Sequence, residues 1–317
     1  MNINRRHFIG GTLASAAVLG TAGCVPPDQS PSGRLVGQLR IIEAQADGTL
    51  GVELFDTGTR MSVGLNSARR FGHCSSFKMS LAAKVLTLDA RGVIDADRRV
   101  MWSEDELMFV SPFTQKRLLE GATLRELAEF TQKYSDNTAA NVLLRELGGP
   151  AALTGFWREI GDTTSRLDRY EPALNNVPVT EFLDTTTPAA MARTVARLVY
   201  GDVMPEAQRE TLRQWMIDTP TGARRVRAGL PEGWVAGDKT GTSIWPGIEP
   251  IYADIGFVEP PAENGVPRAP ITFATYLRTQ RMKEPMDPVA EQALARVGEV
   301  LASMVTGPDW FPYTDRL

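Results

Sequence analysis

Ser75 and Lys78 are the first pair in the sequence whose residue types and spacing suggest covalent chemistry. They lie three positions apart at the start of a segment whose apolar residues recur every three or four positions, so a helix would place both side chains on one face. A serine hydroxyl is a weak nucleophile until a neighbouring base takes its proton, and a buried lysine near other cations can act as that base. A helix N-terminus also offers free N–H groups to a developing oxyanion. Because serine and lysine are common, this pair alone is weak evidence.

Two further motifs with the same type of chemistry follow along the chain. Ser135-Asp136-Asn137 comes first, and Lys239-Thr240-Gly241-Thr242 lies later, in a strand-like stretch that starts at Trp234. Together with Ser75-x-x-Lys78, and in this order, they resemble the motif set of the penicillin-recognising serine enzymes. Asp136 is the exception within the set, because it is a good helix N-cap and we expect it to hold backbone rather than substrate. Jointly, the motifs indicate one acyl-transfer site.

The segment from Arg166 to Asn175 extends the match. It reads Arg-Leu-Asp-Arg-Tyr-Glu-Pro-Ala-Leu-Asn, and with it the sequence resembles the class A serine β-lactamases over roughly residues 36 to 305. In that family this segment is the Ω-loop, whose glutamate and asparagine, here Glu171 and Asn175, hold a water against the acyl ester. The resemblance implies hydrolysis of the β-lactam ring of antibiotics, and hence resistance, through a Ser75 acyl-enzyme that Glu171 deacylates as general base. It implies neither a cofactor nor a metal.

The resemblance also assigns the remaining motif residues. Ser135 would relay a proton to the leaving lactam nitrogen, and Asn137 would contact the side-chain amide of the substrate. The backbone N–H groups of Ser75 and Thr242 would form the oxyanion hole. The substrate carboxylate would be bound by Lys239, Thr240 and Thr242, with Arg225 beneath them.

Arg169 and Asp184 are expected, by the same resemblance, to form the ion pair that closes the neck of the Ω-loop. Such a pair is partly buried, and breaking it would leave one charge uncompensated at a cost of about 3–5 kcal/mol. Mutation of either residue is therefore expected to loosen Glu171 before it unfolds the protein.

Two positions depart from the family pattern. Val110 stands where the family usually carries an aromatic residue that stacks on the substrate ring. Cys74 stands where some carbapenem-hydrolysing relatives have a disulfide-bonded cysteine, but the partner position holds Ser243, so we expect Cys74 to be a buried free thiol. Which β-lactams are hydrolysed does not follow from the sequence.

Two other functions share these motifs. A D,D-peptidase or transpeptidase of peptidoglycan synthesis would use the first three motifs and the same acyl-serine step, but Glu171 with Asn175 argues against it. A β-lactam sensor or binding protein would be acylated without turnover, and sensors of this kind normally carry extra transmembrane segments, of which we see none after Cys24. Whether Lys78 or Glu171 takes the Ser75 proton during acylation is left open.

Apolar periodicity predicts an α+β fold. We expect an antiparallel sheet built from both chain ends and flanked by helices, a mainly helical lobe, and the active site in the cleft between them. The predicted strands span 50–55, 60–64, 234–237, 251–258 and 271–277, and the first and last helices span 35–47 and 289–304. The expected boundaries are an export signal over 1–23, a linker over 24–34, and a domain over 35–317, with an α/β lobe of about 35–72 and 226–317 and a helical lobe of about 73–225.

The composition limits the partners of the protein. With 43 % hydrophobic and 23 % charged residues in 317, the chain is ordinary globular material. Its net charge of −4 would become about −6 without the two arginines of the signal, which argues against nucleic acid or anionic lipid as a partner. His73 is the single histidine outside the signal, so a multi-histidine zinc site is excluded, whereas a Ser-His-Asp triad is not. We expect a monomer whose partner is a small β-lactam.

Residues 1–23 have the pattern of an export signal. Arg5 and Arg6 precede an apolar run from Phe8 to Ala22 that is too short to span a bilayer stably. The order Asn4-Arg5-Arg6-His7-Phe8-Ile9 resembles a twin-arginine signal, with an ordinary secretory signal as the alternative. Thr21-Ala22-Gly23-Cys24 resembles a lipobox, with Thr21 where leucine is usual, so lipidation of Cys24 is left open. By either route we expect the protein in the periplasm, without an internal disulfide if Cys24 is removed or lipidated.

Overall fold

The sheet of this protein is antiparallel and takes its strands from both ends of the chain. The computed structural model describes residues 30–280 and 287–307. Strands β1 (Gly48–Asp56) and β2 (Ser62–Leu65) form the predicted opening hairpin, and β1 also pairs with β9 from the other end. The strand order is β2-β1-β9-β8-β7, with β7 at Val235–Ser243, β8 at Ile251–Glu259 and β9 at Ile271–Thr279. The predicted α+β class is confirmed.

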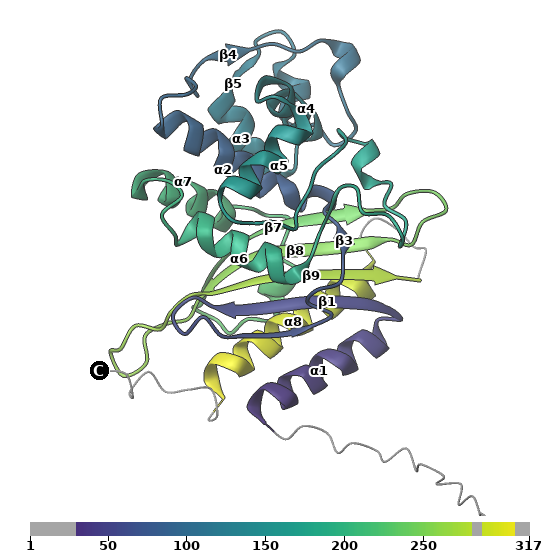
Figure 1. The fold of residues 1–317 in the computed structure, drawn as a ribbon, viewed down its shortest axis with the longest axis vertical. Helices are drawn as coiled ribbons and strands as arrows, with labels where there is room; N and C mark the ends of the chain where they lie inside the picture. The colour runs from purple at the N-terminus through teal and green to yellow at the C-terminus, as the bar shows by residue number, and fades with distance from the viewer. Residues whose placement is uncertain (1–29, 281–286, 308–317) are drawn as a thin grey trace, which may run out of the picture.

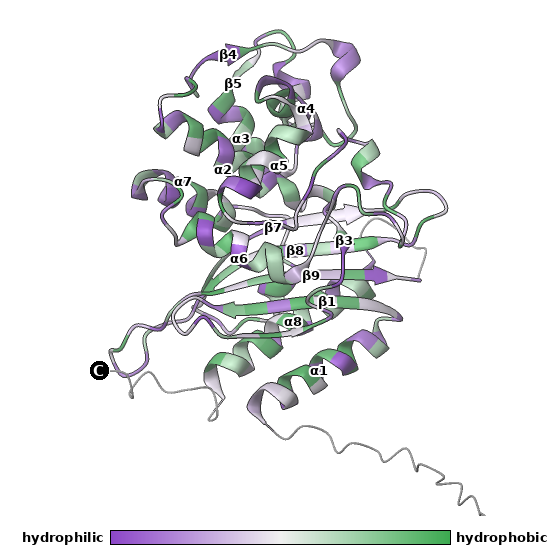
Figure 2. Ribbon diagram, in the orientation of Figure 1, coloured by the Kyte–Doolittle hydropathy of each residue, from purple (hydrophilic) through white to green (hydrophobic). Residues whose placement is uncertain are grey.

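Helices cover both faces of this sheet (Figure 1). Helices α1 (Pro31–Gln45) and α8 (Pro288–Thr306) lie together on one face, where their apolar residues share a core with strands β1, β8 and β9. Helix α6 (Pro188–Val199) lies on the opposite face, where the Thr272 hydroxyl of β9 donates a hydrogen bond of 2.9 Å to the Ala192 carbonyl. Figure 2 shows hydrophobic residues along β1, β8, β9 and α8. Both faces of the sheet are therefore buried.

Helix α1 begins at Pro31, earlier than the predicted start at residue 35. The Ser30 hydroxyl accepts a hydrogen bond of 3.0 Å from the Gly33 N–H group, which makes Ser30 the N-cap. Proline then occupies the first helical turn, where its missing N–H costs nothing. The prediction that residues 31–34 belong to a linker is therefore wrong. The export signal over 1–23 and the linker up to residue 29 lie outside the described residues.

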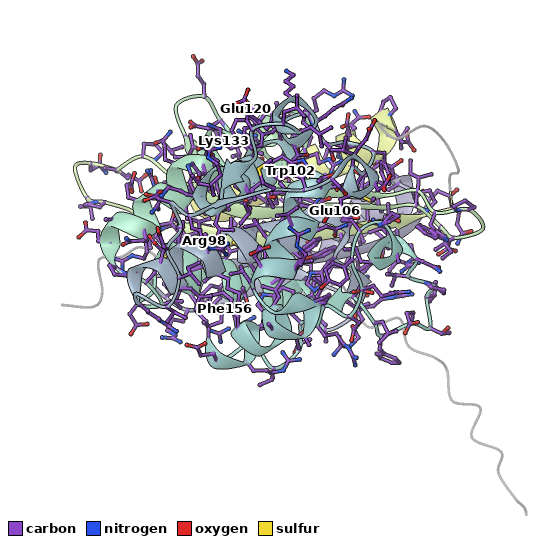
Figure 3. All side chains as sticks on the ribbon, turned by 90° about the horizontal axis from the view of Figure 1, so that it is seen from above. Arg98, Trp102, Glu106, Glu120, Lys133 and Phe156 are labelled. Atoms are coloured by element: carbon purple, nitrogen blue, oxygen red, sulfur yellow. The ribbon has the colours of Figure 1, made fainter. Side chains whose placement is uncertain are left out.

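The helical lobe lies beyond the β7 edge of the sheet (Figure 1). Its main core gathers residues of the lobe helices with sheet residues such as Phe257 and Tyr276. Seen from above, Arg98, Glu106 and Lys133 are among the charged side chains on its outer surface (Figure 3). The lobe helices are α2 (Phe77–Ala90), α3 (Leu124–Tyr134), α4 (Asn137–Glu146), α5 (Gly149–Glu159) and α7 (Glu206–Ile217).

The stretch of chain between β2 and β7 is less uniformly helical than predicted. Two short strand pairs, β3 (Phe71–Gly72) with β6 (Thr185–Thr186) and β4 (Arg99–Val100) with β5 (Ala122–Thr123), tie loops together. Helix α6 belongs to the predicted lobe by its position in the sequence but packs on the sheet. In the part of the chain described here, we find no helix with the length and apolar character needed to cross a bilayer.

Candidate active site

A cleft of about 680 Å³ lies between the β7 edge of the sheet and the helical lobe. Ser75 lines it from the short 3-10 helix η1 (Cys74–Ser76), which leads directly into α2. Strand β7 passes so close to this turn that a Cβ on Gly241 would lie 3.0 Å from the Ser75 backbone nitrogen. A glycine at this position lets the two backbones approach, and the backbone of the next residue, Thr242, comes with it. This proximity is what an oxyanion hole made from both N–H groups requires.

The Lys78 ammonium group is completely buried, and oxygen atoms surround it. Its Nζ lies 3.0 Å from Ser75 Oγ and 3.0 Å from the Ser135 carbonyl oxygen. It also contacts Asn137 Oδ1 and lies 3.1 Å from Glu171 Oε1. An ammonium group has three protons and no acceptor site, so these acceptors share the protons, and Lys78 can take up a proton only after passing one of its own to a neighbour such as Glu171. The predicted nucleophile and base are therefore in direct contact.

The second motif forms the turn between α3 and α4. Ser135 has a left-handed backbone with φ of 60°, and its Oγ lies 3.4 Å from Lys78 Nζ and 3.1 Å from Lys239 Nζ. Asp136 is the N-cap of α4, and its carboxylate also accepts hydrogen bonds from the backbone and side chain of Thr114. The prediction that Asp136 holds backbone is confirmed. Ser135 is left facing both lysines.

Lys239 projects from β7 into the same cluster. It is fully buried, and besides Ser135 its Nζ contacts the Thr240 carbonyl oxygen at 2.7 Å. Burial and the charge of nearby Lys78 hold the pKa of Lys239 well below its usual value. The Thr240 hydroxyl lies 2.7 Å from the Thr221 hydroxyl, which also lines the cleft. Thr221 was not predicted, and no local pattern in the sequence marks it.

Arg225 is almost fully buried beneath the β7 end of the cleft. Its Nη2 donates to Thr242 Oγ1 at 2.7 Å, and its Nη1 donates to the carbonyl oxygens of Gly241 and Ala253. A guanidinium group stays charged at any ordinary pH. The structure thus brings the predicted arginine next to the predicted threonine, at the end of the cleft that suits an anionic group.

Glu171 is held through its backbone as well as its side chain. Its Oε2 accepts a hydrogen bond of 2.6 Å from Asn175 Nδ2, while its Oε1 faces Lys78. Its backbone N–H donates to Asn141 Oδ1 at 2.9 Å, and its carbonyl oxygen accepts from Asn141 Nδ2 at 3.0 Å. The peptide bond from Glu171 to Pro172 is cis. Asn141 was not predicted, although it lies one helical turn after Asn137 on the same face of α4.

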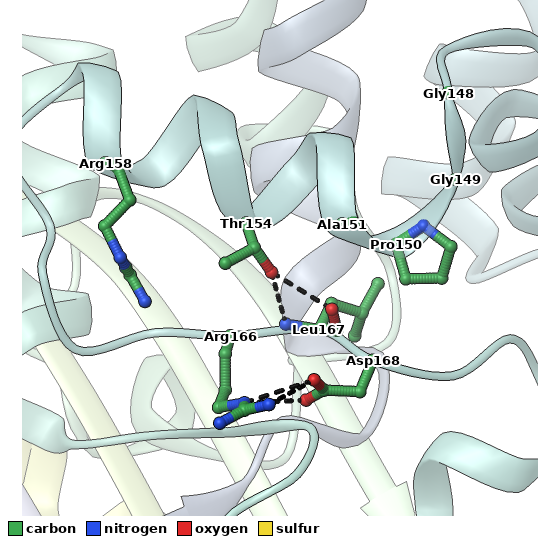
Figure 4. Close-up of a pocket in the computed structure, with 9 residues that line it drawn as sticks. All are labelled: Gly148, Gly149, Pro150, Ala151, Thr154, Arg158, Arg166, Leu167 and Asp168. Atoms are coloured by element: carbon green, nitrogen blue, oxygen red, sulfur yellow. Dashed lines mark hydrogen bonds and ion pairs between the residues drawn. The ribbon is translucent and has the colours of Figure 1, made fainter.

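The neck of the Ω-loop is closed by the predicted ion pair. Arg169 Nε lies 2.5 Å from Asp184 Oδ2, and Asp184 Oδ1 accepts the backbone N–H groups of Asp168 and Arg169. Burial raises the pKa of Asp184 although these hydrogen bonds and Arg169 oppose the rise. On the outer side, Arg166 pairs with Asp168 beside a hollow of about 470 Å³ (Figure 4), where the Thr154 hydroxyl holds the Leu167 backbone. The loop is thus fastened on both sides.

His73 does not provide the base of a Ser-His-Asp triad. Its ring is fully buried and stacks on Trp157, with ring centroids 4.9 Å apart. Burial lowers the pKa of His73 to about 3, so the ring is neutral at physiological pH. The side chain in contact with Ser75 is Lys78, and the triad left open by the sequence is set aside.

Cys74 is a buried free thiol, as predicted. Burial and the charge of Glu171 raise the pKa of Cys74 to about 12, so the thiol stays protonated and unreactive. Ser243, at the position of the missing cysteine partner, instead donates a hydrogen bond of 2.9 Å to the Asn175 carbonyl. A serine there fastens the Ω-loop to β7.

Aromatic side chains line the cleft although Val110 does not supply one. Phe109, Tyr134 and Trp245 all contribute to its wall, and Phe109 is 65 % exposed. The backbone at Phe109 and Val110 is fixed by Asn137, whose Nδ2 donates to the Phe109 carbonyl and whose N–H donates to the Val110 carbonyl. The aromatic surface thus comes from neighbouring positions. Within the described ranges, we find no group of three His, Cys, Asp or Glu side chains placed to hold a metal.

Comparisons with known proteins agree with this geometry. The model of a β-lactamase enzyme family matches residues 34–304. A β-lactamase of Streptomyces fradiae is 42 % identical over 75 % of this chain and 80 % of its own length. The carbapenem-hydrolyzing β-lactamase KPC of Klebsiella oxytoca is 38 % identical over 81 % of this chain and 85 % of its own. The solved structure of an ancestral class A β-lactamase has a TM-score of 0.79 at 42 % identity, covering 85 % of this chain and 99 % of that one.

Proposed function

We propose a mechanism for this chain, which belongs to the class A serine β-lactamases and hydrolyses the β-lactam ring of antibiotics, conferring resistance. The observation that carries the proposal is the position of Glu171. One of its oxygens is 3.1 Å from Lys78 Nζ and the other is 2.6 Å from Asn175 Nδ2. A carboxylate held between the Lys78 ammonium group and the Asn175 amide suits the activation of a water at the Ser75 ester.

Acylation begins when Ser75 Oγ attacks the lactam carbonyl carbon. The hydroxyl proton goes either to Lys78, which lies 3.0 Å away and is neutral once it has given a proton to Glu171, or to Glu171 itself. The N–H groups of Ser75 and Thr242 stabilise the oxyanion. As the carbon–nitrogen bond of the ring breaks, Ser135 donates its proton to the nitrogen and recovers one from the Lys78 side.

Deacylation reverses the roles at the same carbon. Glu171 takes a proton from a water that Asn175 helps to orient, and the resulting hydroxide attacks the ester. Ser75 leaves with a proton returned through Lys78, so the site regains its starting state. This second step separates hydrolysis from the transpeptidase reaction, in which an amine acceptor takes the place of water.

The substrate is held at two ends in this proposal. Its carboxylate binds at Lys239, Thr240 and Thr242 above Arg225, because this end of the cleft carries buried positive charge and two hydroxyl groups. Its side-chain amide contacts Asn137, and its side chain lies against Phe109 and Trp245, whose apolar surfaces stand in for the aromatic residue that Val110 does not provide.

We further propose that the protein works as a monomer in the periplasm, exported by the twin-arginine route through residues 1–23. Arg5 and Arg6 before the apolar run support this route. The Thr21-Ala22-Gly23-Cys24 run supports lipidation at Cys24 as a variant of the same proposal. A sedimentation measurement and the mass of the mature N-terminal peptide test these points.

Intact-protein mass spectrometry with a penicillin tests the mechanism. We compare the wild type with Glu171→Ala while recording hydrolysis by absorbance. Turnover by the wild type, with a persistent single adduct on the variant that maps to Ser75, is the expected result. A stable adduct on the wild type would instead indicate a penicillin-binding peptidase or sensor, and no adduct on either protein would refute the role of Ser75.

A further inference from the structure

Asp254 is a buried carboxyl group behind the carboxylate end of the cleft, and no step above uses it. It lies on β8 with no exposed surface, and its cross-strand partner on β7 is Thr240. We propose that Asp254 is a positioning residue that holds Arg225 in place for recognition of the substrate carboxylate. The inference rests on the mechanism proposed above, because it concerns the same substrate group.

The link from Asp254 to Arg225 is a single backbone hydrogen bond. Asp254 Oδ2 accepts the N–H group of Val226 at 3.1 Å, and Val226 directly follows Arg225 at the start of a short 3-10 helix, η5 (Val226–Gly229). The other side of η5 is pressed against α8, where a Cβ on Gly298 would lie 2.1 Å from the Val226 carbonyl oxygen. Asp254 thus holds the peptide group that directly follows Arg225.

Arg225 differs from the arginines beside it in how its charge is balanced. The next arginine, Arg227, pairs with Asp238 of β7 at 2.5 Å, and Arg224 pairs with Glu291 of α8. Arg225 itself donates to two carbonyl oxygens and one hydroxyl, all of them uncharged. A buried guanidinium needs an opposite charge or dipoles around it. Arg225 has carbonyl and hydroxyl dipoles, so its position depends on how its backbone is held.

The pKa of Asp254 is consistent with a carboxyl group that acts as a hydrogen-bond acceptor for the backbone. Burial and the charge of Asp238 raise the pKa of Asp254, while Arg225, the Val226 N–H group and Arg227 oppose the rise. Burying a carboxyl group in the middle of a largely apolar strand costs folding free energy unless the group makes hydrogen bonds. Removing its side chain should therefore disturb Arg225 more than the sheet.

The test measures how strongly the enzyme prefers a penicillin with a free carboxylate over the methyl ester of the same penicillin. We compare kcat/KM for acid and ester in the wild type, Asp254→Ala, Asp254→Asn, Arg225→Ala and the double variant Asp254→Ala/Arg225→Ala. Thr275→Val is the matched control, because Thr275 is the buried cross-strand partner of Asp254 on β9 and does not contact Arg225. Thermal unfolding of each variant shows whether it is folded.

We expect Asp254→Ala to lower the acid-to-ester preference about tenfold, the effect of weakening one charge-assisted hydrogen bond. Asp254→Asn keeps an acceptor for the Val226 N–H group, so it should retain or increase the preference, and Thr275→Val should not change it. The double variant should lose no more than Arg225→Ala alone.

Three results would overturn the proposal: an equal loss for acid and ester in Asp254→Ala, losses that multiply in the double variant, or a lower preference in Asp254→Asn. The asparagine variant decides the matter if the alanine variant does not fold. A wild type that hydrolyses neither acid nor ester would instead refute the proposed function, which keeps the two failures distinguishable.

Discussion

We predict that mutating the two partners of the ion pair at the neck of the Ω-loop lowers the stability of the protein by different amounts. Asp184 is fully buried, whereas the Arg169 side chain is 25 % exposed and also donates to the Asn176 carbonyl oxygen. Arg169→Met leaves a buried carboxylate with two backbone N–H donors but no cation. Asp184→Asn leaves an arginine that can turn toward water. The arginine variant should therefore lose more stability.

The magnitudes follow from the burial of each partner. Leaving a buried charge unpaired costs about 3–5 kcal/mol, and the two remaining N–H groups put Arg169→Met near the lower end, at about 3 kcal/mol. Loss of one hydrogen bond to a charged group costs about 1.5–3 kcal/mol, and solvation of Arg169 puts Asp184→Asn at about 1.5 kcal/mol. Domains of 150–250 residues shift by about 2–4 °C per kcal/mol, and this larger domain of about 280 residues should lie near the lower end, which gives a fall in Tm of roughly 6 °C and 3 °C.

The stability loss of Arg169→Met should also depend on pH. Burial already raises the pKa of Asp184 in the native protein, and removing Arg169 raises it further. Protonation of the folded variant then relieves the unpaired charge, so the variant should recover part of its stability relative to wild type as the pH falls. The same trend should be absent in Asp184→Asn, which has no carboxyl to protonate.

The assay combines thermal unfolding, followed by circular dichroism between pH 5 and 8, with the lifetime of the penicillin adduct by mass spectrometry. Both variants should deacylate more slowly while still folded at room temperature, because Glu171 lies two residues after Arg169. The reasoning is refuted if Asp184→Asn costs as much stability as Arg169→Met, or if either variant loses stability while the adduct lifetime stays at the wild-type value.

Three further outcomes follow from other contacts. Asn141→Ala, which removes both hydrogen bonds to the Glu171 backbone, should slow deacylation about 10- to 100-fold and leave acylation nearly unchanged in stopped-flow measurements; equal slowing of both steps would contradict the assignment. Burial lowers the pKa of His73 to about 3 in the native protein, so the ring stays neutral when the protein is folded but binds a proton when it is unfolded. The stability that His73 contributes is therefore present above about pH 6.5, and below that pH it is lost at up to about 1.4 kcal/mol per pH unit. Urea titrations should show a smaller loss of stability at low pH in His73→Phe. The Cys74 thiol should resist iodoacetamide at pH 8 in the native protein and react in urea, as peptide mapping would show; rapid native labelling would contradict its burial.

Much of the active site could be predicted because its reactive residues lie in short sequence motifs. Ser75 and Lys78 meet because they are three residues apart on one helix, and Asn175 reaches Glu171 within one turn of the chain. Strands β1, β8 and β9 were also predictable, since each is a largely apolar run bounded by turn residues, whereas β7 extends through the polar residues up to Ser243, beyond the predicted end at residue 237. The start of α1 was missed, although Ser30 and Pro31 carry an N-cap signal.

The sequence by itself determined which residue types carry the chemistry and in what order they occur. The tertiary structure alone decided that Asn141 clamps the Glu171 backbone, that Thr221 meets Thr240, and that Asp254 lies behind Arg225. These contacts join residues far apart in the chain through one or two hydrogen bonds each. No periodicity or spacing records such a bond, because its geometry depends on how α4, the Ω-loop, β7 and β8 pack against one another.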